Sequence, residues 1–349
     1  MDELTQQRPG RVLAVRLDSD GDVLLTGPAV RLLALHAGRV DVLTSPTAAA
    51  AARLLPGVQD VLTFDAPWSG YVPPSLEPET VRRTVSDLAA RRYDGAVIFT
   101  SFHQSPLPMA LLARLAEVPF VAATSVDYPG SLLDVRHHRP DGMHEVEAAL
   151  DLVRAAGFRP PDAFDERLAV RRPLPRTTAL QPTVPYVVVH PGASVPSRAP
   201  SPHHSRRIVA ELVQRGHEVV VTGGPAEREL GAFVRSGDER VTDLSGRTTL
   251  AELADVLAGA RCLVVGNTGP AHLAAAVRTP VVSLFSPVVP ARRWAPWGVP
   301  SVVLGDQEAP CAGTRARTCP IAGHPCLSSV PASEVADAVE HLLAPAVVA

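Results

Sequence analysis

The sequence predicts an α/β protein built from two doubly wound parallel sheets, each covered by helices on both faces. Short runs rich in β-branched residues alternate with Ala-, Leu- and Arg-rich segments of helical spacing along nearly the whole chain, which is the pattern of parallel sheets. At 349 residues the chain is long enough for two domains, because a single core rarely grows beyond about 250–300 residues. A stretch without apolar periodicity, 171–185, holds four prolines in fifteen residues and separates the two halves.

The expected strands form two sets. Those of the first half are 12–17, 40–45, 60–64, 94–100 and 120–124, and those of the second half are 186–190, 218–223, 240–245, 262–267, 280–286 and 301–305. We therefore expect a first domain over 1–170, a linker over 171–185 and a second domain over 186–330. The terminal segment, 331–349, contains a capped amphipathic helix.

The composition excludes several classes of protein. With 33 basic and 36 acidic residues the formal charge is −3, so no overall field would hold nucleic acid or an anionic membrane. No apolar run reaches the roughly 18–20 residues of a membrane span, the first ten residues lack a basic signal-peptide start, and four cysteines are too few for a disulfide scaffold. We therefore expect a cytoplasmic protein with at most peripheral membrane contact. All 33 basic residues are Arg, which indicates a GC-rich coding bias.

The first candidate site follows the first strand. In open α/β sheets, ligands bind outside the carboxyl ends of the strands, so two facing sheets would place a site in the cleft between them. The segment RLDSDGDVLLTGPAV carries Asp18, Asp20 and Asp22 beside a single turn glycine, Gly21. Asp22 is a candidate for chemistry, although taken alone it is more simply interpreted as a helix cap. One glycine does not make the dinucleotide fingerprint of nicotinamide enzymes.

The second candidate site is the loop HPGASVPSRAPS after the strand 186–190. Gly192 and Ser194 would let the backbone approach a phosphate, and Arg198 could pair with it bidentately. A Pro-rich surface loop is an equally good interpretation of the same residues.

A glycine pair, Gly223 and Gly224, follows the next strand in VTGGPAERE. Glu227 could accept a hydrogen bond from a ribose hydroxyl there, or it could simply complement the helix dipole.

A fourth turn, in VVGNTGPAHLAAA, ends a strand at Asn267. The N–H groups of Thr268 and Gly269 would bind a phosphate with the helix dipole behind them. His272 lies in the first turn of that helix, where a structural role is the usual one.

Taken together, these motifs resemble glycosyltransferase family 9, the ADP-heptose:lipopolysaccharide heptosyltransferase family. The resemblance rests on RVLAVRLDSDGDVLLTGPAVRLL, HPGAS–PSR, VTGGPAERE, LSGRTTLAELADVLAGA, GNTGPAHLAAA and TPVVSLFSP. It implies a GT-B fold of two Rossmann-like domains facing across a cleft. In such folds the closing helix, here within 331–349, tends to cross back onto the first domain.

The resemblance also implies roles for single residues. Asp22 takes the place of the proposed general base, and Arg198 that of the Lys that contacts the donor phosphate. Asn267 stands where the family has Asp, and Pro200 where it usually has an aromatic residue. Thr248 falls where the family's backbone meets the adenine base.

The function implied is inverting, metal-independent transfer of a sugar, most simply heptose, from an ADP-sugar to the hydroxyl of a saccharide, lipid-linked or small-molecule acceptor. The nucleotide-sugar is a substrate, so we expect no cofactor and no nucleic-acid partner. Lipopolysaccharide biosynthesis is the family's setting, but the GC-rich composition keeps a natural-product acceptor with another nucleotide-sugar open. A non-catalytic nucleotide-sugar-binding protein, a sugar-nucleotide epimerase or hydrolase, and a nicotinamide oxidoreductase are competing hypotheses with less support from these motifs.

Further candidates lie outside these motifs. On the acceptor side we expect Ser101, His103 and Gln104, with His137, His138 and Trp68 as weaker candidates. Cys311, Cys319, Cys326 and His324 lack the short C-x-x-C spacing of structural zinc sites, so loop packing is the simpler interpretation and no metal is expected.

Overall fold

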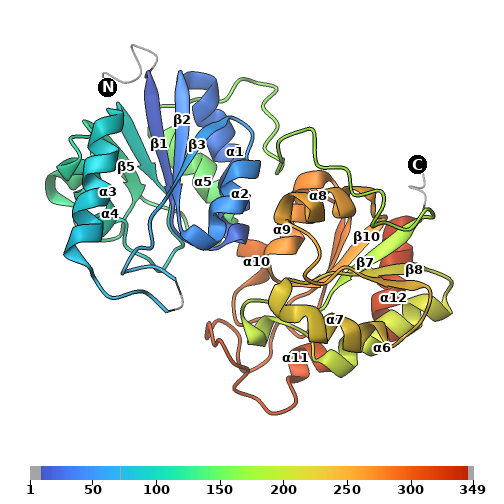
Figure 1. Ribbon diagram of the computed structural model, residues 1–349. Helices are drawn as coiled ribbons and strands as arrows, with labels where there is room; N and C mark the ends of the chain where they lie inside the picture. The colour runs from blue at the N-terminus through green and yellow to red at the C-terminus, as the bar shows by residue number, and fades with distance from the viewer. Residues whose placement is uncertain (1–8, 71, 345–349) are drawn as a thin grey trace. The chain divides into compact units, whose positions relative to one another are not determined.

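The computed structural model describes residues 9–70 and 72–344. The chain divides into two compact units, Met1–Arg171 and Arg172–Ala349 (Figure 1). Each unit contains one six-stranded sheet in which the strands run parallel.

The first sheet has the strand order β3-β2-β1-β4-β5-β6. Its strands are β1 (Arg11–Arg16), β2 (Arg39–Thr44), β3 (Val58–Thr63), β4 (Gly95–Ile98), β5 (Phe120–Thr124) and β6 (Val135–His137). The helices are α1 (Asp20–His36), α2 (Ala49–Leu54), α3 (Pro78–Arg91), α4 (Leu107–Leu115) and α5 (Glu145–Ala155), with short 3-10 turns η2 (Pro46–Ala48) and η3 (Gly130–Leu132).

Helices cover both faces of this sheet, with α1, α2 and α5 on one side and α3 and α4 on the other (Figure 1). The central strands are therefore apolar on both faces; in β1 every residue from Val12 to Arg16 is buried. Arg16 differs from the other buried residues of β1 because it is a cation, with only 4% of its surface exposed.

The second sheet has the order β12-β11-β10-β7-β8-β9. Its strands are β7 (Tyr186–His190), β8 (Glu218–Val221), β9 (Val241–Asp243), β10 (Cys262–Gly266), β11 (Val281–Leu284) and β12 (Ser301–Leu304). The helices are α6 (Pro202–Gln214), α7 (Arg228–Arg235), α8 (Leu250–Gly259), α9 (Gly269–Val277), α10 (Ala291–Trp294), α11 (Pro325–Ser328) and α12 (Ala332–Leu343), with 3-10 turns η4 (Pro196–Arg198) and η5 (Pro225–Glu227). Both sheets repeat one doubly wound order, which places ligand-binding loops at the carboxyl ends of the strands.

The closing helix packs within the second unit, where α12 lies on α6 and on the sheet. That it crosses back onto the first domain stays a prediction. Its apolar face, carried by Val335, Ala336 and Val339, is buried in that core, and Arg215 of α6 pairs with Asp337. Residues 345–349 of the expected terminal segment lie outside the described residues.

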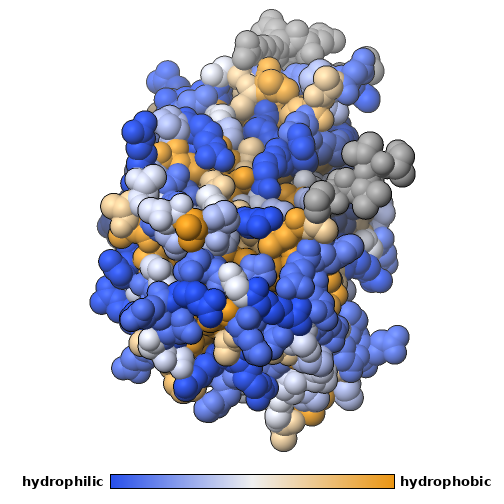
Figure 2. All heavy atoms as spheres, turned by 90° about the vertical axis from the view of Figure 1, so that its right-hand side faces the viewer, coloured by the Kyte–Doolittle hydropathy of each residue, from blue (hydrophilic) through white to orange (hydrophobic). Residues whose placement is uncertain are grey.

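The surface is mixed in character. Figure 2 shows one face on which hydrophilic side chains surround small hydrophobic groups. Within residues 9–70 and 72–344, no helix combines the length and the apolar character needed to cross a membrane.

Candidate active site

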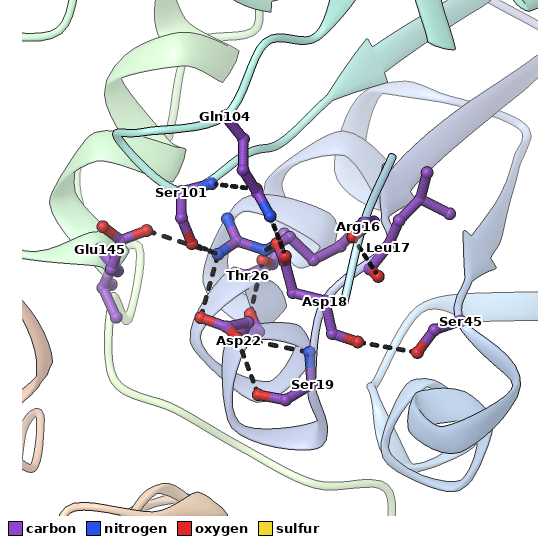
Figure 3. A network of polar contacts seen from close by, with 12 residues as sticks. Arg16, Leu17, Asp18, Ser19, Asp22, Thr26, Ser45, Ser101, Gln104 and Glu145 are labelled. Atoms are coloured by element: carbon purple, nitrogen blue, oxygen red, sulfur yellow. Dashed lines mark hydrogen bonds and ion pairs between the residues drawn. The ribbon is translucent and has the colours of Figure 1, made fainter. Parts of the chain in front are cut away.

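A buried cation organises the carboxyl edge of the first sheet. The guanidinium of Arg16 pairs with three carboxylates: Nε lies 2.8 Å from Oδ2 of Asp18, and Nη2 lies 3.1 Å from Oδ1 of Asp22 and 3.6 Å from Glu145 (Figure 3). Burial lowers the pKa of Arg16, but the three carboxylates together hold it above its ordinary value. Nη1 of Arg139 lies 2.8 Å from Oε1 of Glu145, the carboxylate oxygen that Arg16 does not contact. The buried charges of Arg139 and Glu145 therefore compensate one another.

The loop after β4 closes this network. Nη2 of Arg16 donates to Oγ of Ser101 over 2.9 Å, and the Ser101 N–H donates to Oε1 of Gln104. The Gln104 amide in turn donates to Oδ1 of Asp18 over 2.5 Å (Figure 3). Ser101 and Gln104, expected on the acceptor side, therefore position the charged groups. We call Arg16, Asp18, Asp22, Ser101, Gln104 and Glu145 the Arg16 cluster.

Asp22 caps a helix and keeps its carboxylate partly exposed. It lies in the first turn of α1, where its Oδ2 accepts from the hydroxyl of Ser19 at 2.7 Å and from the Ser19 N–H at 3.4 Å. The carboxylate thus caps the helix, while 19% of its side chain stays exposed.

The neighbouring carboxylates are less well solvated. Burial raises the pKa of Asp18 above its ordinary value, by more than Arg16 lowers it. Burial also raises the pKa of Asp20 to about 6.

In the second unit, the loops after β7 and β8 meet at Glu227. A Cβ at Gly192 would lie 1.8 Å from a carboxylate oxygen of Glu227, so a larger residue there would require the Glu227 side chain to move. The Gly224 N–H donates to Glu227 over 2.6 Å, and His190 Nε2 lies 3.9 Å from it. Burial lowers the pKa of His190, with only partial opposition from Glu227. Gly192, Gly223, Gly224 and Glu227 therefore lie together, as the sequence suggested they could.

The loop that carries Arg198 crosses the end of β10. A Cβ at Gly266 would lie 2.2 Å from the carbonyl oxygen of Arg198, and Ser197 is held by Arg317 and Ala316 through hydrogen bonds of 2.9 and 2.5 Å to their carbonyl groups. Within the described residues, Nε of Arg198 is buried and makes no hydrogen bond. Such a group suits a phosphate oxygen.

In the turn from β10 to α9, Thr268 precedes the first helical residue, Gly269, and Pro270 follows it, so the Gly269 N–H lies at the positive end of the helix. The Thr268 N–H already donates to the carbonyl of Gly266 over 2.9 Å. His272 is buried in the first turn.

Asn267 has a different environment from the one expected. Its amide donates to the carbonyl of Ser286 at 3.3 Å and accepts from the Ser286 N–H at 3.1 Å. The side chain therefore joins the ends of β10 and β11, instead of pointing only at a ligand.

Three other predicted residues, Ser194, Thr248 and His103, are partly or fully exposed. Ser194 is exposed, and Thr248 precedes the capping residue of α8, which is Thr249. His103 is exposed and stacks edge-on against Phe102. His137 is an edge-strand residue, buried between Thr124 and Asp151, so its role is structural.

Three of the four cysteines lie in the core of the second unit, and Cys319 is partly exposed. Cys262, Cys311 and Cys326 are buried, and burial raises the pKa of Cys326 to about 11. Among residues 9–70 and 72–344, no group of three or more His, Cys, Asp or Glu side chains is suited to a metal ion.

Sequence reasoning missed Arg16, Arg139 and Glu145. An Arg inside an apolar strand was a usable signal, because a buried cation needs a carboxylate partner. Two of its partners, Asp18 and Asp22, follow it closely in the sequence, but the third was not visible, since Glu145 lies on the last helix of the unit.

Residues 81–324 match the family model of glycosyltransferase family 9 (heptosyltransferase). The chain belongs to this family. A relative is lipopolysaccharide heptosyltransferase 1 of Pseudomonas aeruginosa, 30% identical over 339 residues that cover 88% of this chain and 87% of the relative. The chain is accordingly a glycosyltransferase.

Solved structures of heptosyltransferases share the fold. The Escherichia coli ADP-heptose lipopolysaccharide heptosyltransferase II superposes with a TM-score of 0.73 at 20% identity, over 95% of this chain and 98% of that one. The E. coli heptosyltransferase WaaC with ADP-2-deoxy-2-fluoro heptose gives 0.70 at 22% identity, over 95% and 99%. The predicted GT-B fold, with two parallel six-stranded α/β sheets, is confirmed.

Proposed function

We propose that the chain transfers a heptosyl group from ADP-heptose to an acceptor hydroxyl with inversion, and that Asp22 is the general base. The observation that supports this most is the carboxylate of Asp22. It is oriented by Ser19 and Arg16 and remains partly exposed at the carboxyl end of β1. A general base needs both a fixed direction and access to the proton that it removes.

The second unit supplies groups for the leaving diphosphate. As the bond to the anomeric carbon breaks, negative charge builds on the phosphate oxygens, and the acceptor proton passes to Asp22. Arg198 and the N–H of Gly269 would stabilise that charge, and the N–H of Thr268 would join them by giving up its bond to the Gly266 carbonyl. Glu227 remains the candidate partner of the ribose hydroxyls, and Thr248 and Ser194 remain candidates for the base and the phosphates.

The donor proposed here follows the relatives. One E. coli structure is of WaaC with ADP-2-deoxy-2-fluoro heptose and another is of WaaC with ADP, and the P. aeruginosa relative is a lipopolysaccharide heptosyltransferase. Lipopolysaccharide biosynthesis is the setting that these names support. The cytoplasm stays the location that we propose.

The test separates donor binding from turnover. Calorimetry with ADP, UDP, GDP and TDP should show tight binding of ADP alone, and preference for another nucleotide would contradict the donor. Release of ADP from ADP-heptose is then measured across a panel of hydroxylated acceptors. Asp22→Asn should bind ADP as wild type does and lose at least about 100-fold in kcat, whereas Asp87→Asn, an exposed carboxylate of α3, should change neither. Turnover by Asp22→Asn within a few-fold of wild type would refute the role of Asp22.

A further inference from the structure

Residues 309–326, which we call the cysteine segment, carry three of the four cysteines and pack on the second unit. Cys311 and Cys326 are each 1% exposed and belong to its core. The N–H groups of Gly313 and Arg315 donate to carbonyl groups of the loop after β11, over 2.9 and 2.8 Å. The cysteine segment is therefore fixed both to the core and to the end of β11.

Ser197, the residue before Arg198, is bound to the cysteine segment by several of its polar groups. The residue is completely buried. Its N–H donates to the carbonyl of Arg317 over 2.9 Å, and its hydroxyl donates to the carbonyl of Ala316 over 2.5 Å. Burial lowers the pKa of His324, and the backbone of Ser197 partly offsets this, so the His324 ring lies against that backbone.

The position of Arg198 depends on these contacts. Its own N–H donates to the carbonyl of Val195, which only closes the local turn η4. Within the described residues, the Nε of Arg198 is buried and makes no hydrogen bond. In the same part of the chain, the hydrogen bonds that join η4 to a distant segment are both donated by Ser197. The guanidinium is therefore held in place through Ser197.

The second element proposed to bind the diphosphate is tied to the same stretch of chain. Asn267 exchanges two hydrogen bonds with Ser286, and the turn after Asn267 presents the N–H of Gly269. The cysteine segment binds the carbonyl groups of the next two residues, Pro287 and Val288. Groups that stabilise a developing charge act best when they are fixed before the reaction. The cysteine segment supplies such a support for both elements.

We infer that Ser197 is a positioning residue for the donor diphosphate: bound to the cysteine segment, it holds the guanidinium of Arg198 where the leaving diphosphate binds. Ser197 does not itself touch the substrate; it acts through Arg198. The inference rests on the proposed function, because it concerns the same donor site. It also gives the cysteine segment a role in donor binding, as the support of a phosphate-binding loop.

The test removes one hydroxyl group and measures ADP affinity by calorimetry. Ser197→Ala breaks the bond to the Ala316 carbonyl, so the binding of ADP must supply the free energy that this bond contributed to holding the loop. ADP affinity should fall by about five- to tenfold, the contribution of one hydrogen bond between neutral groups. Adenosine, which lacks the diphosphate, should bind this variant as it binds wild type.

Ser283→Ala is the matched control. Ser283 is a completely buried serine of β11, and within the described residues its hydroxyl makes no hydrogen bond. The substitution therefore removes the same atom from the same unit without releasing a loop. It should change the affinity for neither ADP nor adenosine.

A double-mutant cycle shows whether the effect passes through Arg198. In an Arg198→Ala background, Ser197→Ala should cause no further loss of ADP affinity. A full loss in that background, an equal loss of affinity for adenosine, or unchanged ADP affinity in Ser197→Ala alone would overturn the inference.

A second variant keeps the test decisive if Ser197→Ala does not fold. Thr314 is exposed, and its hydroxyl donates to the Cys311 carbonyl over 2.7 Å and accepts from the Ala316 N–H at 3.4 Å. Thr314→Val loosens the cysteine segment without a change of shape, so it should weaken ADP binding in the same direction and leave adenosine binding and melting as in wild type. Wild-type ADP affinity in Thr314→Val would then overturn the inference. Absence of ADP binding by wild type removes the proposed function, whereas ADP binding that both variants leave unchanged removes only the positioning role.

Discussion

Replacing Gly266 with alanine tests whether the loop that carries Arg198 binds the donor diphosphate. A Cβ at this position would lie 2.2 Å from the carbonyl oxygen of Arg198, about 1 Å short of the roughly 3.3 Å at which carbon and oxygen meet. The added Cβ is fixed to the backbone of residue 266, and the oxygen belongs to the backbone of Arg198. Rotation of a side chain therefore cannot relieve the clash. The loop must therefore move by about that distance.

The expected loss follows from the geometry of a hydrogen bond. Moving a guanidinium by about 1 Å takes an N–H···O contact from about 2.9 Å to nearly 4 Å, where little of it remains. A hydrogen bond to a charged group contributes about 1.5–3 kcal/mol. Gly266→Ala should therefore weaken ADP binding by roughly 10- to 100-fold, close to the effect of Arg198→Ala.

The assay is a double-mutant cycle for ADP affinity measured by calorimetry. If Gly266→Ala acts by moving Arg198, the double variant should bind ADP no more weakly than Arg198→Ala alone. Gly27→Ala is a suitable control, because its Cβ would meet only the flexible tip of Leu55 at 3.2 Å, in the other unit. Losses that multiply in the double variant, or an unchanged affinity for Gly266→Ala, would refute the reasoning.

Three further changes test the electrostatics of the two units. Burial raises the pKa of Asp20 to about 6 from an ordinary 3.8, so the folded protein should lose stability as pH rises from about 4 to about 6. Asp20→Asn should remove that loss and raise the free energy of unfolding above pH 6 by up to about 3 kcal/mol, measured by urea titration. Parallel pH curves for the two proteins would contradict this. Asn267→Asp places a carboxylate against the Ser286 carbonyl in place of an amide donor, so its melting temperature should fall by an amount that corresponds to about 1–3 kcal/mol; a stability equal to wild type would show that this amide is dispensable. Glu145→Gln leaves Arg139 without its buried partner and should lower the free energy of unfolding by about 3 kcal/mol, a loss that urea titration would detect and that an unchanged midpoint would disprove.

The strands could be predicted because the signals for a strand lie within the strand and in the turns beside it. Apolar runs bounded by turn residues predict each strand of the second sheet to within about two residues of its observed bounds. The missed strand, β6, spans only Val135–His137, and just one of its three residues is buried. A short, half-polar edge strand has no periodicity to detect, so the sequence does not predict it.

The close approaches between loops could not be predicted. Gly266 shows in the sequence only as the end of an apolar run, and nothing there indicates that the carbonyl of Arg198 passes over it. The sequence indicates phosphate access at Gly192, yet its Cβ position is occupied by Glu227. Both close approaches are contacts between segments that end or follow neighbouring strands of the sheet but are distant in the chain.

The capping and catalytic interpretations of Asp22 are compatible, and the structure shows why. Each carboxylate oxygen can accept two hydrogen bonds. The helix cap uses Oδ2, through Ser19, and the Arg16 cluster uses Oδ1, through Nη2 of Arg16. Both contacts fix the direction of the carboxylate, while 19% of the side chain stays exposed. A cap that would normally argue for a structural role therefore supplies the orientation that a general base requires.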